Sequence, residues 1–171
     1  MKKVTILLAF IFSLAFIFPI YSNEKKNISN EHEFSFYTGM FDFSDDGQRA
    51  TLVGVQHQNE SLKRKSFLGT LSPITGFIIT ENNAQYFYTG IQAQYKIGKL
   101  NVVPSFTPGL YGKGDGKDLG HVVEFKSEVQ LSFDLFSDSE LGFSYNHISN
   151  ASLGKKNPGA NNYMFNFIKQ F

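Results

Sequence analysis

The residues best suited to chemistry in this sequence are a histidine and a serine two positions apart, His147 and Ser149. In an extended strand, residues i and i+2 point to the same face, so the two side chains would be neighbours. An imidazole beside a hydroxyl can act as a general base and make the hydroxyl a nucleophile. A bare His-x-Ser pair has little specificity, so its meaning depends on the element that carries it.

Composition excludes several classes of function. The 171 residues suffice for one domain, and a formal net charge of +1 gives no strong field for nucleic acid. The chain has no cysteine, which excludes disulfides and cysteine-ligated zinc. His57 and His121 are isolated in the sequence, so we expect no metal site and no cofactor. Aromatic residues make up 16% of the chain, which suits a lipid-facing surface.

The first segment is typical of a secretory signal peptide. Lys2 and Lys3 form a positive start, residues 4–20 are apolar, and Ser22 is a small residue at the polar boundary. We therefore predict a signal peptide over residues 1–22 and a barrel domain over residues 23–171. A single transmembrane anchor is the alternative, although the apolar run is barely long enough to span a bilayer.

The rest of the chain alternates between apolar and polar residues in segments of about ten, separated by turn-forming residues, as in membrane barrels. The mean hydropathy of −0.19 does not reveal this pattern. The sequence predicts eight strands, at residues 32–43, 48–58, 66–79, 84–97, 99–112, 119–136, 139–150 and 160–171.

The strand at 119–136 shows the two faces most clearly. Its apolar face carries Val123, Phe125, Val129, Leu131, Phe133 and Leu135, and its polar face carries Glu124, Lys126, Glu128, Gln130, Ser132 and Asp134. Alternation alone does not separate a membrane barrel from a soluble lipocalin-like barrel with its charged face in water. An eight-stranded barrel is filled by side chains, and Glu124, Lys126 and Glu128 could pair within it.

The last strand favours the membrane barrel. Tyr163, Phe165 and Phe167 share a face with the final residue, Phe171. Such an ending resembles the terminal signal that the barrel assembly machinery reads. We therefore expect an all-β, eight-stranded antiparallel transmembrane β-barrel in the bacterial outer membrane. An even strand count places both termini in the periplasm. The extracellular loops are then expected near residues 44–47, 80–83, 112–118 and 151–159.

The alternation within their strand indicates on which face of the barrel the histidine and the serine lie. Leu141, Phe143 and Tyr145 form a lipid-facing stripe, and His147 and Ser149 continue it. The pair therefore lies on the barrel exterior, near the extracellular end of its strand. The polar groups available there are the esters of lipid A in the outer leaflet.

The surrounding motif resembles that of a known family. The segment His147-Ile148-Ser149-Asn150-Ala151, with Leu153 and Asn157-Pro158-Gly159 after it, is similar to the lipid A 3-O-deacylases, the PagL-type outer-membrane barrels. A weaker match is Gly112-x-Gly114-x-x-x-Asp118-Leu119-Gly120, followed by Glu124-Phe125-Lys126. The resemblance implies a serine esterase that removes the 3-O-linked hydroxyacyl chain from the lipid A of lipopolysaccharide.

The resemblance also implies roles for single residues. Ser149 looks like the nucleophile, His147 like the base, and Asn150 and Asn157 like residues of the oxyanion site. The family pattern has a glutamate as the acid, whereas the corresponding residue here is Asn161. An amide oxygen can hold an imidazole tautomer, but it stabilises an imidazolium less than a carboxylate does. Ser152 stands where the family often has glycine, so the backbone near the oxyanion is expected to differ.

Some alternatives stay open at this point. Asp42, Asp45 and Asp46 are expected to form a solvated turn rather than a cation site. Lys155 and Lys156 lie in the loop beside the predicted site, where they either attract lipid A phosphates or only keep the loop soluble. The chain could also be a non-catalytic barrel with a structural or adhesive role, or a soluble lipid-binding barrel. Expected partners are lipid A, outer-membrane lipid and the assembly machinery, with a homodimer left open.

Overall fold

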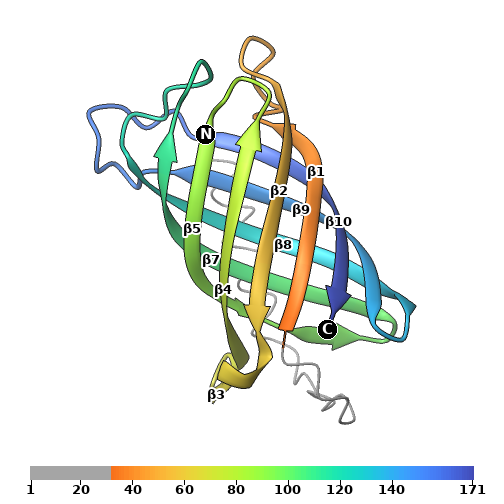
Figure 1. The fold of residues 1–171 in the computed structure, drawn as a ribbon. Coiled ribbons are helices and arrows are strands. Elements are labelled where there is room, and N and C mark those ends of the chain that lie inside the picture. The colour runs from red at the N-terminus through yellow and green to blue at the C-terminus, as the bar shows by residue number, and fades with distance from the viewer. Residues whose placement is uncertain (1–31) are drawn as a thin grey trace.

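The computed structural model describes residues 32–171, which form a tilted barrel of antiparallel strands (Figure 1). The predicted signal peptide lies outside the described residues. The elements are β1 (His32–Phe41), β2 (Ala50–Asn59), the 3-10 helix η1 (Glu60–Leu62), β3 (Arg64–Ser66), β4 (Gly69–Thr80), β5 (Gln85–Ala93), β6 (Tyr95–Ile97), β7 (Leu100–Gly112), β8 (Val123–Phe136), β9 (Ser139–Ser149) and β10 (Ala160–Gln170).

Backbone pairing closes the sheet on itself. The strands follow the order β2-β1-β10-β9-β8-β7-β5-β4, and β2 also pairs with β4. All of these pairs are antiparallel. The three-residue strands β3 and β6 only extend this ladder, by pairing with β4 and β7. The predicted eight-stranded antiparallel barrel is therefore confirmed.

Two of the predicted strands begin later in the structure, each next to a glycine that redirects the chain. The strand expected from residue 66 begins at Gly69. Ser66 instead ends the short strand β3, which pairs with the start of β4, and Gly69 has a φ of +88° at this tight turn. The strand expected from residue 119 begins at Val123, because the loop continues through Gly120 at a φ of +97°. A left-handed φ is incompatible with a regular strand and is adopted readily by glycine.

The barrel has a loop end and a turn end. The loops after β1, β4, β7 and β9 gather at the loop end, which is the upper end in Figure 1. The connections β2–β4, β5–β7 and β8–β9 and the C-terminus lie at the opposite, turn end. The two longest loops, residues 113–122 and 150–159, are neighbours at the loop end.

The interior of the barrel is polar, as expected for the membrane barrel that the last strand favoured. Lys126 is fully buried, and its ammonium lies 3.1 Å from Glu128 and 4.2 Å from the centre of the Tyr88 ring. Asn146 donates to the same glutamate at 3.1 Å. A buried charge is costly unless it is paired and hydrogen-bonded, so these contacts are what make the charged interior tolerable.

One expectation about a single residue was wrong. Glu124 is buried but does not join Lys126 and Glu128, because both of its carboxylate oxygens have no hydrogen-bond partner in the described chain. His57, which is isolated in the sequence, has a histidine neighbour in the fold. Its Nε2 lies 2.9 Å from Nδ1 of His32, and the two rings stack across neighbouring strands. Sequence spacing does not reveal either result, because both depend on which strands pair.

The barrel exterior is apolar. Large exposed side chains cover it on β1, β5, β7, β9 and β10, among them Phe36, Phe87, Phe106, Phe143 and Phe165. The exposed face is the one that alternation assigned to lipid. A soluble protein would bury these rings, so the arrangement favours hydrocarbon as the surrounding medium.

Within residues 32–171, no helix is long and apolar enough to cross a membrane.

Breaking the interior ion pair is expected to destabilise the barrel strongly. Lys126→Met leaves Glu128 buried without its cation, which should cost about 3–5 kcal/mol. The measurement is urea unfolding of the refolded barrel in detergent micelles. As a control, Lys96→Met removes a partly exposed pair with Asp134, which is worth less than about 1 kcal/mol. Equal losses for both variants would contradict this account of the interior.

Candidate active site

His147 and Asn161 face each other across β9 and β10. They are direct partners in the strand register, which brings side chains on one face close together. Nδ1 of His147 lies 2.8 Å from Oδ1 of Asn161. An amide oxygen only accepts, so Nδ1 carries the proton and donates it. The hydroxyl of Tyr145, on the same face of β9, donates to the same oxygen at 2.9 Å.

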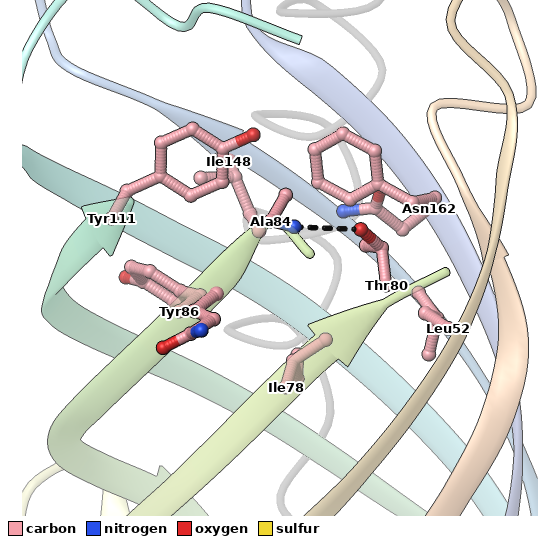
Figure 2. A pocket seen from close by; sticks show the side chains of 10 residues that line it. Leu52, Ile78, Thr80, Ala84, Tyr86, Tyr111, Ile148 and Asn162 are labelled. Carbon is pink, nitrogen blue, oxygen red and sulfur yellow. Dashed lines mark hydrogen bonds between the residues drawn. The ribbon is translucent and has the colours of Figure 1, made fainter. Parts of the chain in front are cut away.

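The residue between the histidine and the serine anchors the strand. Ile148 points into the barrel, is 1% exposed, and lines a small internal cavity at the loop end with Leu52, Tyr111 and Asn162 (Figure 2). In the same view, the backbone of Ala84 donates to Thr80 at 3.1 Å and closes the β4–β5 loop. Because Ile148 is held inside, its two neighbours in the strand must face outward.

Ser149 ends β9 and is partly exposed. Among residues 32–171 its hydroxyl forms no hydrogen bond with the His147 ring, whose Nε2 also has no partner there. Catalytic hydrogen bonds are often long without substrate and tighten when it binds. The serine hydroxyl and the unprotonated Nε2 therefore lie two positions apart on one face, and neither is committed to another group.

The glycine after the β9–β10 loop leaves room for the histidine ring. A Cβ on Gly159 would lie 2.7 Å from Cε1 and 3.0 Å from Nε2 of His147. Its φ of +62° is left-handed as well. Glycine is therefore required here both by backbone conformation and by the close approach of the imidazole.

Asn150 organises the two long loops. Its buried side chain donates to the carbonyls of Leu119 and Lys156 at 2.8 and 2.9 Å, and its Oδ1 accepts from the backbone of Ser152 at 2.9 Å. Its own backbone N–H donates to Oδ1 of Asn157 at 3.0 Å. The side-chain polar atoms of Asn150 therefore bind the two loops, and Nδ2 of Asn157, whose Oδ1 accepts from the residue after Ser149, has no hydrogen-bond partner among the described residues.

The backbone after the serine is left-handed at two successive residues. Ala151 has a φ of 51° and Ser152 a φ of 69°. L-residues adopt this region at a cost that glycine does not incur. The family pattern often has glycine at the second position, and the structure shows that Ser152 keeps the conformation that glycine would favour.

Asp42 lies buried beside the site, contrary to expectation. It was expected in a solvated turn, but it is 1% exposed and forms an ion pair with Lys117 from the β7–β8 loop. Its Oδ1 also accepts from the backbone of Asn161 at 3.2 Å. Ser44, two residues on, accepts from Nδ2 of Asn161 at 2.9 Å. These contacts have no sequence signal, because Lys117 lies 75 residues from Asp42 and Asn161 lies more than a hundred residues from Asp42 and Ser44.

Several charged side chains of the two longest loops form ion pairs. Lys156 contacts Asp118 at 2.9 Å, and this hydrogen bond, with one from the backbone of Gly120, lowers the pKa of Asp118 below its ordinary value. Lys155, in contrast, is exposed and has no partner among the described residues. Between residues 32 and 171 there is no cluster of three or more metal-ligating side chains.

Comparison with known proteins places the chain in a family. The family model of the lipid A 3-O-deacylases (PagL) matches residues 53–169, which include the histidine, the serine and the asparagine that faces the histidine. The chain belongs to the lipid A 3-O-deacylase family. The match begins after the β1–β2 loop, so Asp42 and Ser44 lie outside it. No curated protein sequence gives a significant match to the chain.

Solved structures agree on the fold of this deacylase-family chain. The crystal structure of the outer membrane enzyme PagL superposes with a TM-score of 0.59 at 15% identity, covering 81% of this chain and 99% of that one. A de novo designed transmembrane β-barrel gives a TM-score of 0.56 at 9% identity, covering 86% of this chain and all of the design. Family membership and fold together make this chain an outer-membrane β-barrel.

Filling the space at Gly159 is expected to displace the histidine ring. In Gly159→Ala the new methyl would overlap Cε1 of His147, so the ring must leave Asn161. NMR of ¹⁵N-histidine-labelled barrel should then lose the protected Nδ1–H resonance of His147. Gly112→Ala is the control, since a methyl at that position would have no neighbour within 4 Å and the spectrum should not change. An unchanged resonance in Gly159→Ala would contradict the described packing.

Proposed function

We propose that this barrel is an outer-membrane esterase that removes the 3-O-linked hydroxyacyl chain from lipid A. The observation that carries the proposal is the hydrogen bond of 2.8 Å between His147 and Asn161, on the same outward face as Ser149. It fixes the proton on Nδ1 and leaves Nε2 free as a base. Membership of the lipid A 3-O-deacylase family supports the substrate.

The reaction would proceed in two halves. The Ser149 hydroxyl attacks the ester carbonyl while Nε2 of His147 takes its proton, and the carbonyl oxygen becomes an oxyanion. Collapse breaks the bond to the sugar oxygen, which leaves with the proton from His147. Water then attacks the acyl-enzyme in the same way and releases the hydroxy fatty acid. All of these steps use groups of the chain and water.

The oxyanion would be stabilised by the β9–β10 loop, where Asn157 is hydrogen-bonded to the backbone of Asn150. Nδ2 of Asn157 is an available donor there, and Asn150 holds the loop that carries it. A well-placed donor to an oxyanion is worth about 2.7–4 kcal/mol in the transition state. Lys155 is available beside this loop for lipid A phosphates. Binding by the assembly machinery and the homodimer stay predictions.

Orientation in the membrane follows from the same proposal. The substrate ester lies in the outer leaflet, so the loop end would be extracellular and the turn end periplasmic. The site then meets lipid A at the level where its acyl chains join the sugar. The rival is a non-catalytic barrel with a structural role, which the replacement of the expected glutamate by Asn161 would favour.

Removing the nucleophile is expected to abolish deacylation. In Ser149→Ala no hydroxyl remains to form the acyl-enzyme, so lipid A from cells expressing the variant should keep all its acyl chains. Mass spectrometry of extracted lipid A is the measurement, with the wild type releasing one 3-hydroxyacyl chain. Ser66→Ala, at the turn end, is the control and should behave as wild type. Unmodified lipid A from well-expressed, folded wild-type barrel would reject the esterase in favour of the structural role.

Restoring a carboxylate opposite the histidine is expected to raise activity. Asn161→Glu places a negative charge beside the imidazolium that forms in the transition state, which should increase kcat roughly tenfold, or about 1.4 kcal/mol. Asn161→Gln is the matched control, because it has the same length without the charge. Steady-state assays on purified lipid A would measure both. A fall in kcat for Asn161→Glu would mean that the surrounding residues have adapted to an amide.

A further inference from the structure

The two polar atoms of the Asn161 side chain have opposite hydrogen-bonding roles. Oδ1 accepts from His147 and Tyr145, and Nδ2 donates to Ser44 at 2.9 Å. If the amide turned over, Nδ2 would face His147, and the ring would have to accept at Nδ1. Nε2 would then carry the proton and could not act as a base. A glutamate has two equivalent oxygens and does not face this choice.

Asp42 limits the orientation of the Ser44 hydroxyl. Oδ1 of Asp42 lies 3.4 Å from Oγ of Ser44, and a carboxylate can only accept, so the hydroxyl proton points to Asp42. The lone pairs of Oγ are then available to Nδ2 of Asn161. Lys117 holds Asp42 from the other side, and the backbone N–H of Asn161 adds a further donor.

We propose that Ser44 and Asp42 are positioning residues that orient the Asn161 amide and, through it, select the His147 tautomer in which Nε2 is the free base. The proposal rests on the proposed function for its catalytic meaning. It adds a loop that lies outside the matched family region, between β1 and β2. A chain of fixed donors and acceptors then runs from Lys117 to His147.

A purely structural role is the competing explanation. The same loop is fastened to β10 by two other bonds, from the backbone of Asp42 to Asn162 at 2.8 Å and from that of Phe43 to Asn161 at 2.9 Å. Neither bond involves the Ser44 hydroxyl. Removing that hydroxyl should therefore leave the loop in place and change only the preference of the amide for one orientation.

The first test needs no activity. In ¹⁵N-histidine NMR of the refolded barrel, His147 should be the Nδ1–H tautomer in the wild type, assigned with His147→Gln. Ser44→Ala should shift it towards a mixture with the Nε2–H tautomer, and Ser44→Thr, which keeps the hydroxyl, should restore the wild-type spectrum. Asp42→Asn should act like Ser44→Ala, whereas Asp46→Asn in the same loop should not. An unchanged tautomer in Ser44→Ala overturns the proposal.

The second test uses the symmetry of a carboxylate. Ser44→Ala should lower kcat about tenfold with little change in KM, the size expected from losing one hydrogen bond. In the Asn161→Glu background the same substitution should change kcat by less than about twofold, since the carboxylate needs no orienting. Equal losses in both backgrounds would make Ser44 merely structural and reject the proposal. If no variant deacylates lipid A, the proposed function fails, and the tautomer measurement still decides this inference.

Discussion

Backbone hydrogen bonding around the closed barrel is the constraint on which the rest of the structure depends. Hydrocarbon offers no partner for a peptide N–H or C=O, so a membrane-spanning sheet must have no free edge. Here the pairs β1–β10 and β2–β4 complete the circle. Once the circle is closed, each strand has a fixed inner and outer face. A slip of one residue in β9 would turn Ser149 inward and Ile148 outward.

The same constraint decides where charge is allowed. The lipid-facing wall carries rings and aliphatic side chains, so charged groups gather inside the barrel or in the loops. Lys126 and Glu128 pair in the barrel interior, and Asp42 and Lys117 pair between the β1–β2 and β7–β8 loops. The Asp42–Lys117 pair joins two loops, whereas Lys126 and Glu128 lie two positions apart on β8. In each pair the partner neutralises a buried charge. Glu124 is the exception, since its buried carboxyl oxygens have no partner in the described chain.

The candidate site lies at the loop ends of β9 and β10, where strands and loops make different contributions. The strands bring His147 and Asn161 into direct register, which sets their separation without help from any loop. The loops supply a hydrogen-bond acceptor for the amide nitrogen, which a carboxylate would not need. Ser44 occupies the amide nitrogen, and Asn150 holds the backbone that follows Ser149. In the proposed mechanism, an asparagine in the position of the acid would therefore act by holding the imidazole in one orientation rather than by its charge.

The sequence by itself determined the features that repeat with a period of two residues. Alternation predicted the eight strands and their two faces, because side-chain direction in a strand depends only on position. The aromatic last strand, ending at Phe171, then assigned the apolar face to lipid and so predicted the polar interior and the outward position of His147 and Ser149. Only the tertiary structure decided the contacts between loops and between non-adjacent strands. Asp42 looked like part of a solvated turn until Lys117, 75 residues away, was found beside it. Loop contacts have no periodicity, so their partners become known only when the closed barrel brings its loops together.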